Sequence, residues 1–131
     1  MTPDSREVTL LIVDDEVPIL NSLRRCLRRE GYRILTAASP AKALVLLQDN
    51  RVDIILSDHK MPGMDGIDLL EEVRRQQPGA VRLLISGWSE TIPRDRLDAL
   101  ELLAVLPKPW DDAALKSALR EAAGKIPASA S

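Results

Sequence analysis

Short apolar runs alternate with amphipathic stretches along the chain, and this alternation predicts the secondary structure. Five runs rich in Val, Ile and Leu are predicted as β-strands, at residues 8–13, 32–37, 52–57, 81–86 and 103–106. Between and after them, apolar residues recur every three or four positions, as in amphipathic helices. The expected inward positions are Leu20, Leu23 and Leu27, then Ala43, Leu44 and Leu47, then Ile67, Leu70 and Val73, then Leu97 and Leu100, and finally Leu115, Leu119 and Ala122. Strands that alternate with helices predict an α/β fold with an open parallel sheet and helices on both faces.

Residues at the expected helix ends support these assignments. Gly31 stands where a C-cap of the first helix is expected, and Ser39 followed by Pro40 forms an N-terminal signal for the second. The fourth helix, at about residues 91–102, has the weakest apolar pattern. Either Asp111 or Asp112 is expected to cap the last helix.

Composition limits the class of protein. The chain has 131 residues, 45% of them hydrophobic, which fits one folded domain rather than a disordered segment. We expect an N-terminal arm at residues 1–7, the domain at 8–124, and a tail or truncated linker at 125–131. The apolar runs are too short to cross a membrane. A single cysteine, Cys26, is typical of a protein from the reducing cytoplasm.

Charge and aromatic content argue against nucleic-acid binding. The net charge is −2 and the aromatic residues are only Tyr32, Trp88 and Trp110. Base-stacking platforms are therefore not expected. Four arginines lie mostly off the leucine face of the first helix and are expected to form a solvated helix face, namely Arg24, Arg25, Arg28 and Arg29.

Polar residues follow four of the five predicted strands. Asp14 and Asp15 follow the first, Asp58 the third, Ser86 ends the fourth and Lys108 follows the fifth. In open parallel sheets, ligands bind outside the carboxyl ends of the strands. Carboxylates gathered in one cleft repel each other unless a hard cation such as Mg²⁺ lies between them. A hydroxyl and an ammonium group beside them suit the oxygens of a phosphoryl group.

Four segments carry a resemblance to a known family. LLIVDDE, SDHKMPGMDG, LLISGWS and PKPW, in this order and spacing, resemble the receiver domain of bacterial two-component response regulators, including the chemotaxis regulators. The resemblance extends from about Val8 to Ala123. It implies a doubly wound, flavodoxin-like fold with five parallel strands in the order 2-1-3-4-5 and five helices.

The resemblance also implies a role for each strand-end residue. Asp58 would be the phosphoacceptor, attacking a phosphohistidine of a partner kinase. Asp15 would bind Mg²⁺ directly and Asp14 largely through water. Asp58 and the backbone carbonyl of Lys60 would complete the protein ligands.

The remaining implied roles concern the phosphoryl group and its surroundings. Ser86 would donate its hydroxyl to the phosphoryl group, and Lys108 would form an ion pair with it. Pro109 matches the position of a cis-proline that aims this lysine.

Three positions are expected to modulate this chemistry. Val105 stands where the family usually carries an aromatic residue that swings inward on activation. Lys60 and Trp88 flank the path of an attacking water, and we hypothesise that together they prolong the phosphorylated state. His59, next to Asp58, is expected to be a surface or packing residue rather than a second phosphorylation site.

The expected function is a phosphorylation-controlled signalling domain that catalyses only its own phosphorylation and dephosphorylation. Its implied partners are a sensor histidine kinase or phosphotransfer protein and an unidentified output domain or protein; a homodimer is also possible. No membrane or direct nucleic-acid contact is expected. The alternative function is a degenerate receiver that binds partners without phosphorylation.

Two enzyme or ligand-binding classes fit less well. A Mg²⁺-dependent phosphatase or phosphotransferase with a nucleophilic aspartate commonly has an acid two residues later, where this chain has Lys60. A nucleotide-binding module would carry a glycine-rich loop after the first strand, and this chain has none there.

Overall fold

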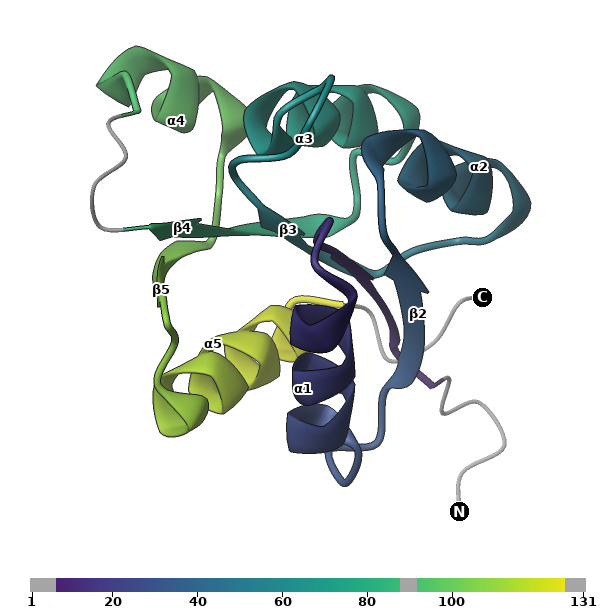
Figure 1. Cartoon of the computed structure of the whole chain (residues 1–131). Helices are drawn as coiled ribbons and strands as arrows, with labels where there is room; N and C mark the ends of the chain where they lie inside the picture. The colour runs from purple at the N-terminus through teal and green to yellow at the C-terminus, as the bar shows by residue number, and fades with distance from the viewer. Residues whose placement is uncertain (1–6, 88–91, 127–131) are drawn as a thin grey trace.

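The computed structural model describes residues 7–87 and 92–126 and consists of one five-stranded sheet between two layers of helices. All strand pairs are parallel, and the strand order is β2-β1-β3-β4-β5. In Figure 1, α2, α3 and α4 cover one face of the sheet, and α1 and α5 cover the other. The elements are β1 (Thr9–Val13), α1 (Val17–Leu27), β2 (Arg33–Ala37), α2 (Pro40–Asp49), β3 (Ile54–Asp58), α3 (Gly66–Gln76), β4 (Val81–Gly87), α4 (Arg94–Leu100), β5 (Ala104–Lys108) and α5 (Asp112–Gly124). This arrangement confirms the predicted fold class and strand order.

The sheet separates two hydrophobic clusters. Leu11 and Val13 of β1 belong to the cluster under α2, α3 and α4, whereas Leu10 and Ile12 belong to the cluster under α1 and α5. Successive side chains of a strand point to opposite faces, so apolar residues at every position bury both faces. Every residue of β1 and β3 is buried. The apolar runs therefore fix the central strands, and with them the place where the polar strand ends meet.

Side-chain caps define where several helices begin. The Ser39 hydroxyl accepts a hydrogen bond from the Lys42 backbone N–H at 3.1 Å. The Asp111 carboxylate accepts one from Ala114 at 2.8 Å, so Asp111 rather than Asp112 caps α5. Asp65 caps α3 in the same way, a role that the sequence pattern did not indicate.

Some element ends differ from the prediction. Gly31, with φ of 89°, does not cap α1, because that helix ends at Leu27 and the chain makes a further turn first. Helix α4 ends at Leu100, where Glu101 adopts a left-handed conformation with φ of 52°. Strand β5 continues to Lys108, past the predicted end at residue 106. Its pairing with β4 extends over the two extra residues, which places Lys108 on the sheet itself.

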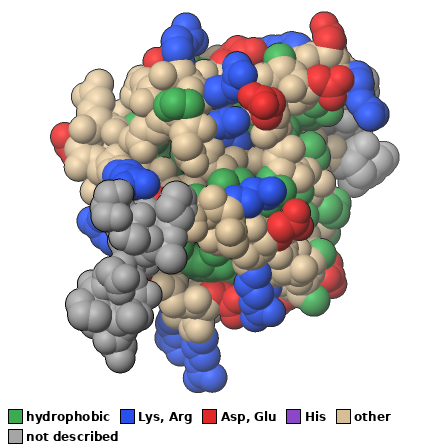
Figure 2. Space-filling view, turned by 180° about the vertical axis from the view of Figure 1, so that it is seen from behind, with side chains coloured by type: hydrophobic (Ala, Val, Ile, Leu, Met, Phe, Trp, Pro, Cys, Tyr) green, Lys and Arg blue, Asp and Glu red, His purple; other side chains and the backbone are tan. Residues whose placement is uncertain are grey.

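The surface is charged and mixed in sign. The face seen from behind in Figure 2 shows basic and acidic side chains interspersed. Arg24 and Arg25 are exposed on α1, as expected for a solvated helix face, whereas Arg28 and Arg29 are exposed in the turn that follows the helix. Within the described residues, no helix is both long enough and apolar enough to cross a membrane.

Candidate functional site

The parallel register brings the polar strand ends to one edge of the sheet. Val13 pairs with Ser57, so Asp14 and Asp58 follow at neighbouring positions on β1 and β3. Asp58 pairs with Ile85 of β4, and Gly87 pairs with Lys108 of β5. Four segments that are distant in sequence thus contribute to one acidic rim, which we define as Asp14, Asp15, Glu16, Asp58, Ser86 and Lys108.

Lys108 links the acids of the rim. Its Nζ lies 3.2 Å from a carboxylate oxygen of Asp14, 3.3 Å from one of Asp58 and 3.5 Å from one of Glu16. The Asp14 and Asp58 side chains are almost fully buried. Lys108 is the shared cation of two buried carboxylates, so one positive charge faces two negative ones inside the protein.

Burial and this imbalance of charge shift the pKa values of Asp58, Asp14 and Lys108. Burial and, to a lesser degree, the nearby Asp14 raise the pKa of Asp58 to about 6, although Lys108 counteracts both. Burial also raises the pKa of Asp14, against the opposing effects of the Glu16 N–H and Lys108. Burial acts to lower the pKa of Lys108, but its interactions with Asp14 and Asp58 hold that pKa above its usual value. Lys108 is therefore charged at neutral pH, and Asp58 carries a carboxylate that protonates more readily than usual.

Backbone hydrogen bonds hold both buried acids in place. An Asp14 carboxylate oxygen accepts a hydrogen bond from the Glu16 N–H at 2.8 Å. After Asp58, the His59 N–H donates to the Ile85 carbonyl at 2.9 Å, which keeps the chain against β4. The Gly66 N–H then donates to the His59 carbonyl at 2.7 Å.

Gly66 is needed for this close approach. A Cβ atom at that position would overlap the carbonyl oxygen of Asp58. The glycine thus allows the start of α3 to pack directly on the backbone of Asp58. The sequence pattern does not indicate this role, since the partner atom lies on another element.

The rim contains donors suited to a divalent cation. Asp14, Asp15 and Glu16 each place a carboxylate oxygen within 4.8 Å of the others, and Asp15 and Glu16 are exposed. Hard cations such as Mg²⁺ bind carboxylate oxygens, retain waters and accept exposed ligands, so this donor set fits one. Glu16 was not among the predicted ligands, although its place directly after the two aspartates could have indicated it.

The other predicted site residues differ in burial and position. Ser86 is buried and lines a cavity of about 370 Å³ between β4, α4 and β5, together with Val105, whose side chain is 45% exposed. Lys60 is exposed, and the peptide bond between Lys108 and Pro109 is cis. His59 is buried, as expected of a packing residue. Trp88 lies outside the described residues.

Comparison with known proteins identifies the family. The family model described as the response regulator receiver domain matches residues 10–120. The chain therefore belongs to this family of two-component signalling domains, as the four sequence segments implied.

Individual relatives agree with this assignment. The hydrogenase transcriptional regulatory protein HoxA of Bradyrhizobium diazoefficiens is 37% identical over 117 residues, covering 87% of this chain and 24% of that protein. The transcriptional regulatory protein CpxR of Klebsiella pneumoniae is 39% identical over 113 residues, covering 85% of this chain and 47% of that protein. The chain thus spans less than half the length of either regulator.

A solved structure shows the same architecture. The signal receiver domain of an HD domain-containing protein from Pseudomonas fluorescens matches with a TM-score of 0.83 and 32% identity. The match covers 91% of this chain and 96% of that one.

Proposed function

We propose that this receiver domain accepts a phosphoryl group on Asp58 from a phosphohistidine of a partner kinase or phosphotransfer protein. The observation that carries the proposal is the position of Asp58. It is a nearly buried carboxylate at the end of a central strand, 3.3 Å from the Lys108 ammonium and beside a second buried acid. Asp58 does not cap the helix that follows it, since α3 is capped by Asp65 instead.

The reaction requires Asp58 as a carboxylate. One of its oxygens attacks phosphorus while the bond from phosphorus to the histidine nitrogen breaks, and the electron pair of that bond stays on the imidazole. With a pKa of about 6, Asp58 is mostly ionised at pH 7 or above and is still a strong enough base to attack. Lys108 offsets the repulsion between this carboxylate and the incoming phosphoryl oxygens.

The same rim would hold Mg²⁺. Asp14, Asp15, Asp58 and the backbone carbonyl of Lys60 are the proposed ligands, and Glu16 adds a fifth oxygen donor at the open side of the rim. When bound, Mg²⁺ neutralises charge on the rim and on the phosphoryl oxygens. Gly66 keeps Asp58 in place for this role by packing on its backbone.

After transfer, Ser86 and Lys108 would bind the phosphoryl oxygens. Ser86 lies on the same cavity as Val105, Leu97 and Leu106, so a shift of its hydroxyl towards Asp58 changes the lining of a surface formed by β4, α4 and β5. A phosphoryl group shifts the balance between two states only through contacts that differ between them, and Ser86 and Lys108 supply such contacts. Val105 and Pro109 would modulate this step, and so would Trp88 and Lys60.

We also propose that a cytoplasmic kinase docks on the surface beside the rim. Val17, the first residue of α1, is 52% exposed directly after the acids that follow β1. An exposed apolar side chain there gives a partner an anchor within reach of Asp58. The domain itself would catalyse only its own phosphorylation and dephosphorylation, with an output domain or protein as the recipient of the signal.

The test is phosphorylation by a small donor. The protein is incubated with acetyl phosphate and Mg²⁺, and the intact mass is recorded over time. We expect the gain of one phosphoryl group, lost without Mg²⁺ and in Asp58→Asn, and retained in Asp49→Asn, which changes an exposed acid at the end of α2. Absence of the gain under every condition would support the degenerate receiver instead.

A further inference from the structure

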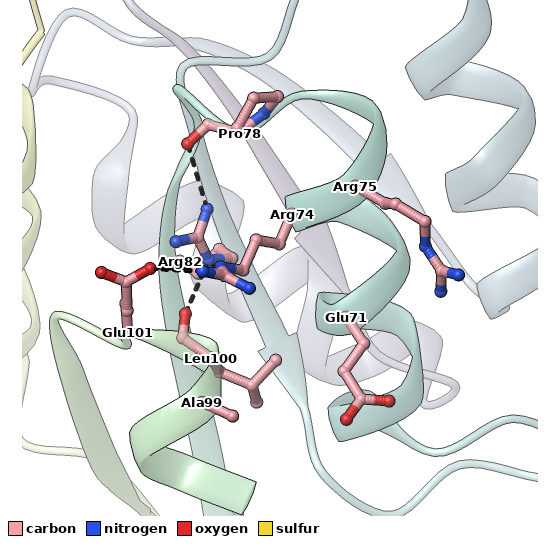
Figure 3. A pocket seen from close by; sticks show the side chains of 8 residues that line it. All are labelled: Glu71, Arg74, Arg75, Pro78, Arg82, Ala99, Leu100 and Glu101. Carbon is pink, nitrogen blue, oxygen red and sulfur yellow. Dashed lines mark hydrogen bonds and ion pairs between the residues drawn. The ribbon is translucent and has the colours of Figure 1, made fainter.

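One cavity lies away from the acidic rim. It has a volume of about 550 Å³ and lies between the C-terminal halves of α3 and α4 and the start of β4 (Figure 3). Arg82, the second residue of β4, lines it. Ser86 follows four residues later, about 13 Å further along the strand, at the opposite end of the sheet. This α3–α4 cavity therefore has no part in the chemistry proposed for Asp58.

Arg82 brings a buried positive charge to the cavity. Only 6% of the residue is exposed, and its contacts are backbone carbonyls. Its Nε donates to the Leu100 carbonyl at 2.9 Å, and its Nη1 donates to the carbonyls of Ala80 at 2.9 Å and Pro78 at 3.3 Å. Within residues 7–87 and 92–126, no carboxylate forms an ion pair with Arg82. A buried charge is normally paired, because leaving water has a large cost.

One nitrogen of this guanidinium also has no acceptor among the described residues. Nε and Nη1 use the three carbonyls, whereas Nη2 donates to none of these groups. A guanidinium presents its N–H groups in one plane, a geometry that suits two oxygens of a carboxylate or phosphate. Arg82 thus retains donor capacity at a cavity wall where, among the described residues, no carboxylate is directly paired with it, and Glu101 acts on its charge only from a distance.

A second arginine of the cavity is held only loosely by its present partner. Arg74 of α3 reaches across to Glu101, which follows α4, and its Nη2 lies 2.7 Å from a Glu101 oxygen (Figure 3). Both side chains are about half exposed or more, and such pairs contribute little stability. Glu101 is therefore a replaceable anion for Arg74.

We propose that the α3–α4 cavity binds a small oxyanion, a carboxylate or a phosphate group, between Arg82 and Arg74. The ligand pairs directly with Arg82 and displaces the Glu101 carboxylate from Arg74. Glu101 competes with the ligand for Arg74, so removal of its carboxylate strengthens binding.

The experiment uses nuclear magnetic resonance with citrate and inorganic phosphate as separate probes. Titrations follow the side-chain Nε–H of Arg82 in Asp58→Asn protein without Mg²⁺, at constant ionic strength set with sodium chloride. This background removes phosphorylation, so the result is independent of the function proposed for Asp58. Saturation by citrate alone identifies a carboxylate ligand, and saturation by phosphate alone identifies a phosphate ligand.

Three further variants give the decisive comparison. Glu101→Gln is expected to tighten binding about threefold, the value of an exposed ion pair. Arg74→Gln is expected to weaken binding about tenfold, the value of a charge-assisted hydrogen bond. Arg25→Gln, an exposed arginine on α1, leaves the affinity unchanged. Absence of saturation by either probe, or equal affinities in all three variants, would overturn the proposal.

Discussion

The two ends of the sheet both bury charge, but they surround it with different groups. At the carboxyl ends, Asp14 and Asp58 share one cation, Lys108, and burial holds the pKa of both acids above normal. At the amino end of β4, Arg82 is surrounded by three carbonyl oxygens, one of them at the C-terminus of α4. Carbonyl dipoles at a helix C-terminus favour a cation. Burial disfavours the charged form at both ends, and it lowers the pKa of Arg82. The first end is reactive, whereas the second is structural.

The largest expected effect on stability is at the amino end of β4, where Arg82 lies. In Arg82→Leu, three carbonyls lose a charged donor, and the domain is expected to lose about 3 kcal/mol of stability, since hydrogen bonds to charged groups are the stronger ones. Urea unfolding monitored by circular dichroism measures this. The matched control, Arg29→Leu in the exposed turn after α1, is expected to change stability by less than about 0.5 kcal/mol. An equally small change in both variants would show that the carbonyl contacts of Arg82 do not matter.

At the acidic rim, by contrast, a substitution is expected to increase stability. In metal-free protein at pH 7.5, Asp58→Asn is expected to raise the free energy of unfolding by about 2–3 kcal/mol. The reason is that the substitution removes a carboxylate whose pKa lies near 6 in the folded protein and near 3.8 in the unfolded chain.

The pH dependence of this difference has a definite direction. A carboxyl whose pKa is raised by folding binds its proton more tightly in the folded state, so its destabilising effect is absent near pH 4 and grows as the pH rises towards 6 and above. Urea unfolding in EDTA between pH 4 and 8 should show the wild type and Asp58→Asn converging at low pH. A difference that is constant with pH would contradict the origin assigned to it.

The acidic rim could be predicted from the sequence, whereas the contacts of Arg82 could not. The rim followed from apolar runs that end in Asp14, Asp58 and Lys108, because parallel strands bring their carboxyl ends together. Arg82 gave no such signal, since it is one charge in an apolar strand and one of its acceptors, the Leu100 carbonyl, lies 18 residues away. The end of α4 was misplaced for a similar reason, since Glu101 stops that helix with a left-handed backbone that its residue type does not indicate.

Addition of Mg²⁺ should stabilise the folded protein, because the cation neutralises the carboxylates of the acidic rim. A free concentration ten times the dissociation constant is expected to stabilise the wild type by about 1.4 kcal/mol. Thermal unfolding with increasing MgCl₂ measures the effect, and NaCl at equal ionic strength serves as the reference. Asp15→Asn should lose most of this gain, whereas an unchanged gain in that variant would place the cation elsewhere.

The smallest expected effect belongs to the exposed ion pair between Arg74 of α3 and Glu101, which follows α4. A double-mutant cycle of Arg74→Gln and Glu101→Gln is expected to give a coupling of about 0.5 kcal/mol that declines with added salt. Urea unfolding at low and high NaCl concentration measures it. A coupling several times larger would mean that this surface, and not only Arg82, holds α4 in position.

The central claim is that Asp58, rather than another group of the rim, receives the phosphoryl group. The protein is phosphorylated with acetyl phosphate and Mg²⁺ and reduced with sodium borohydride, which converts an aspartyl phosphate to homoserine, and its peptides are sequenced by mass spectrometry. The account predicts homoserine at position 58 alone. Homoserine at position 14 or 15, or a stable modification of His59 with none at Asp58, would contradict it.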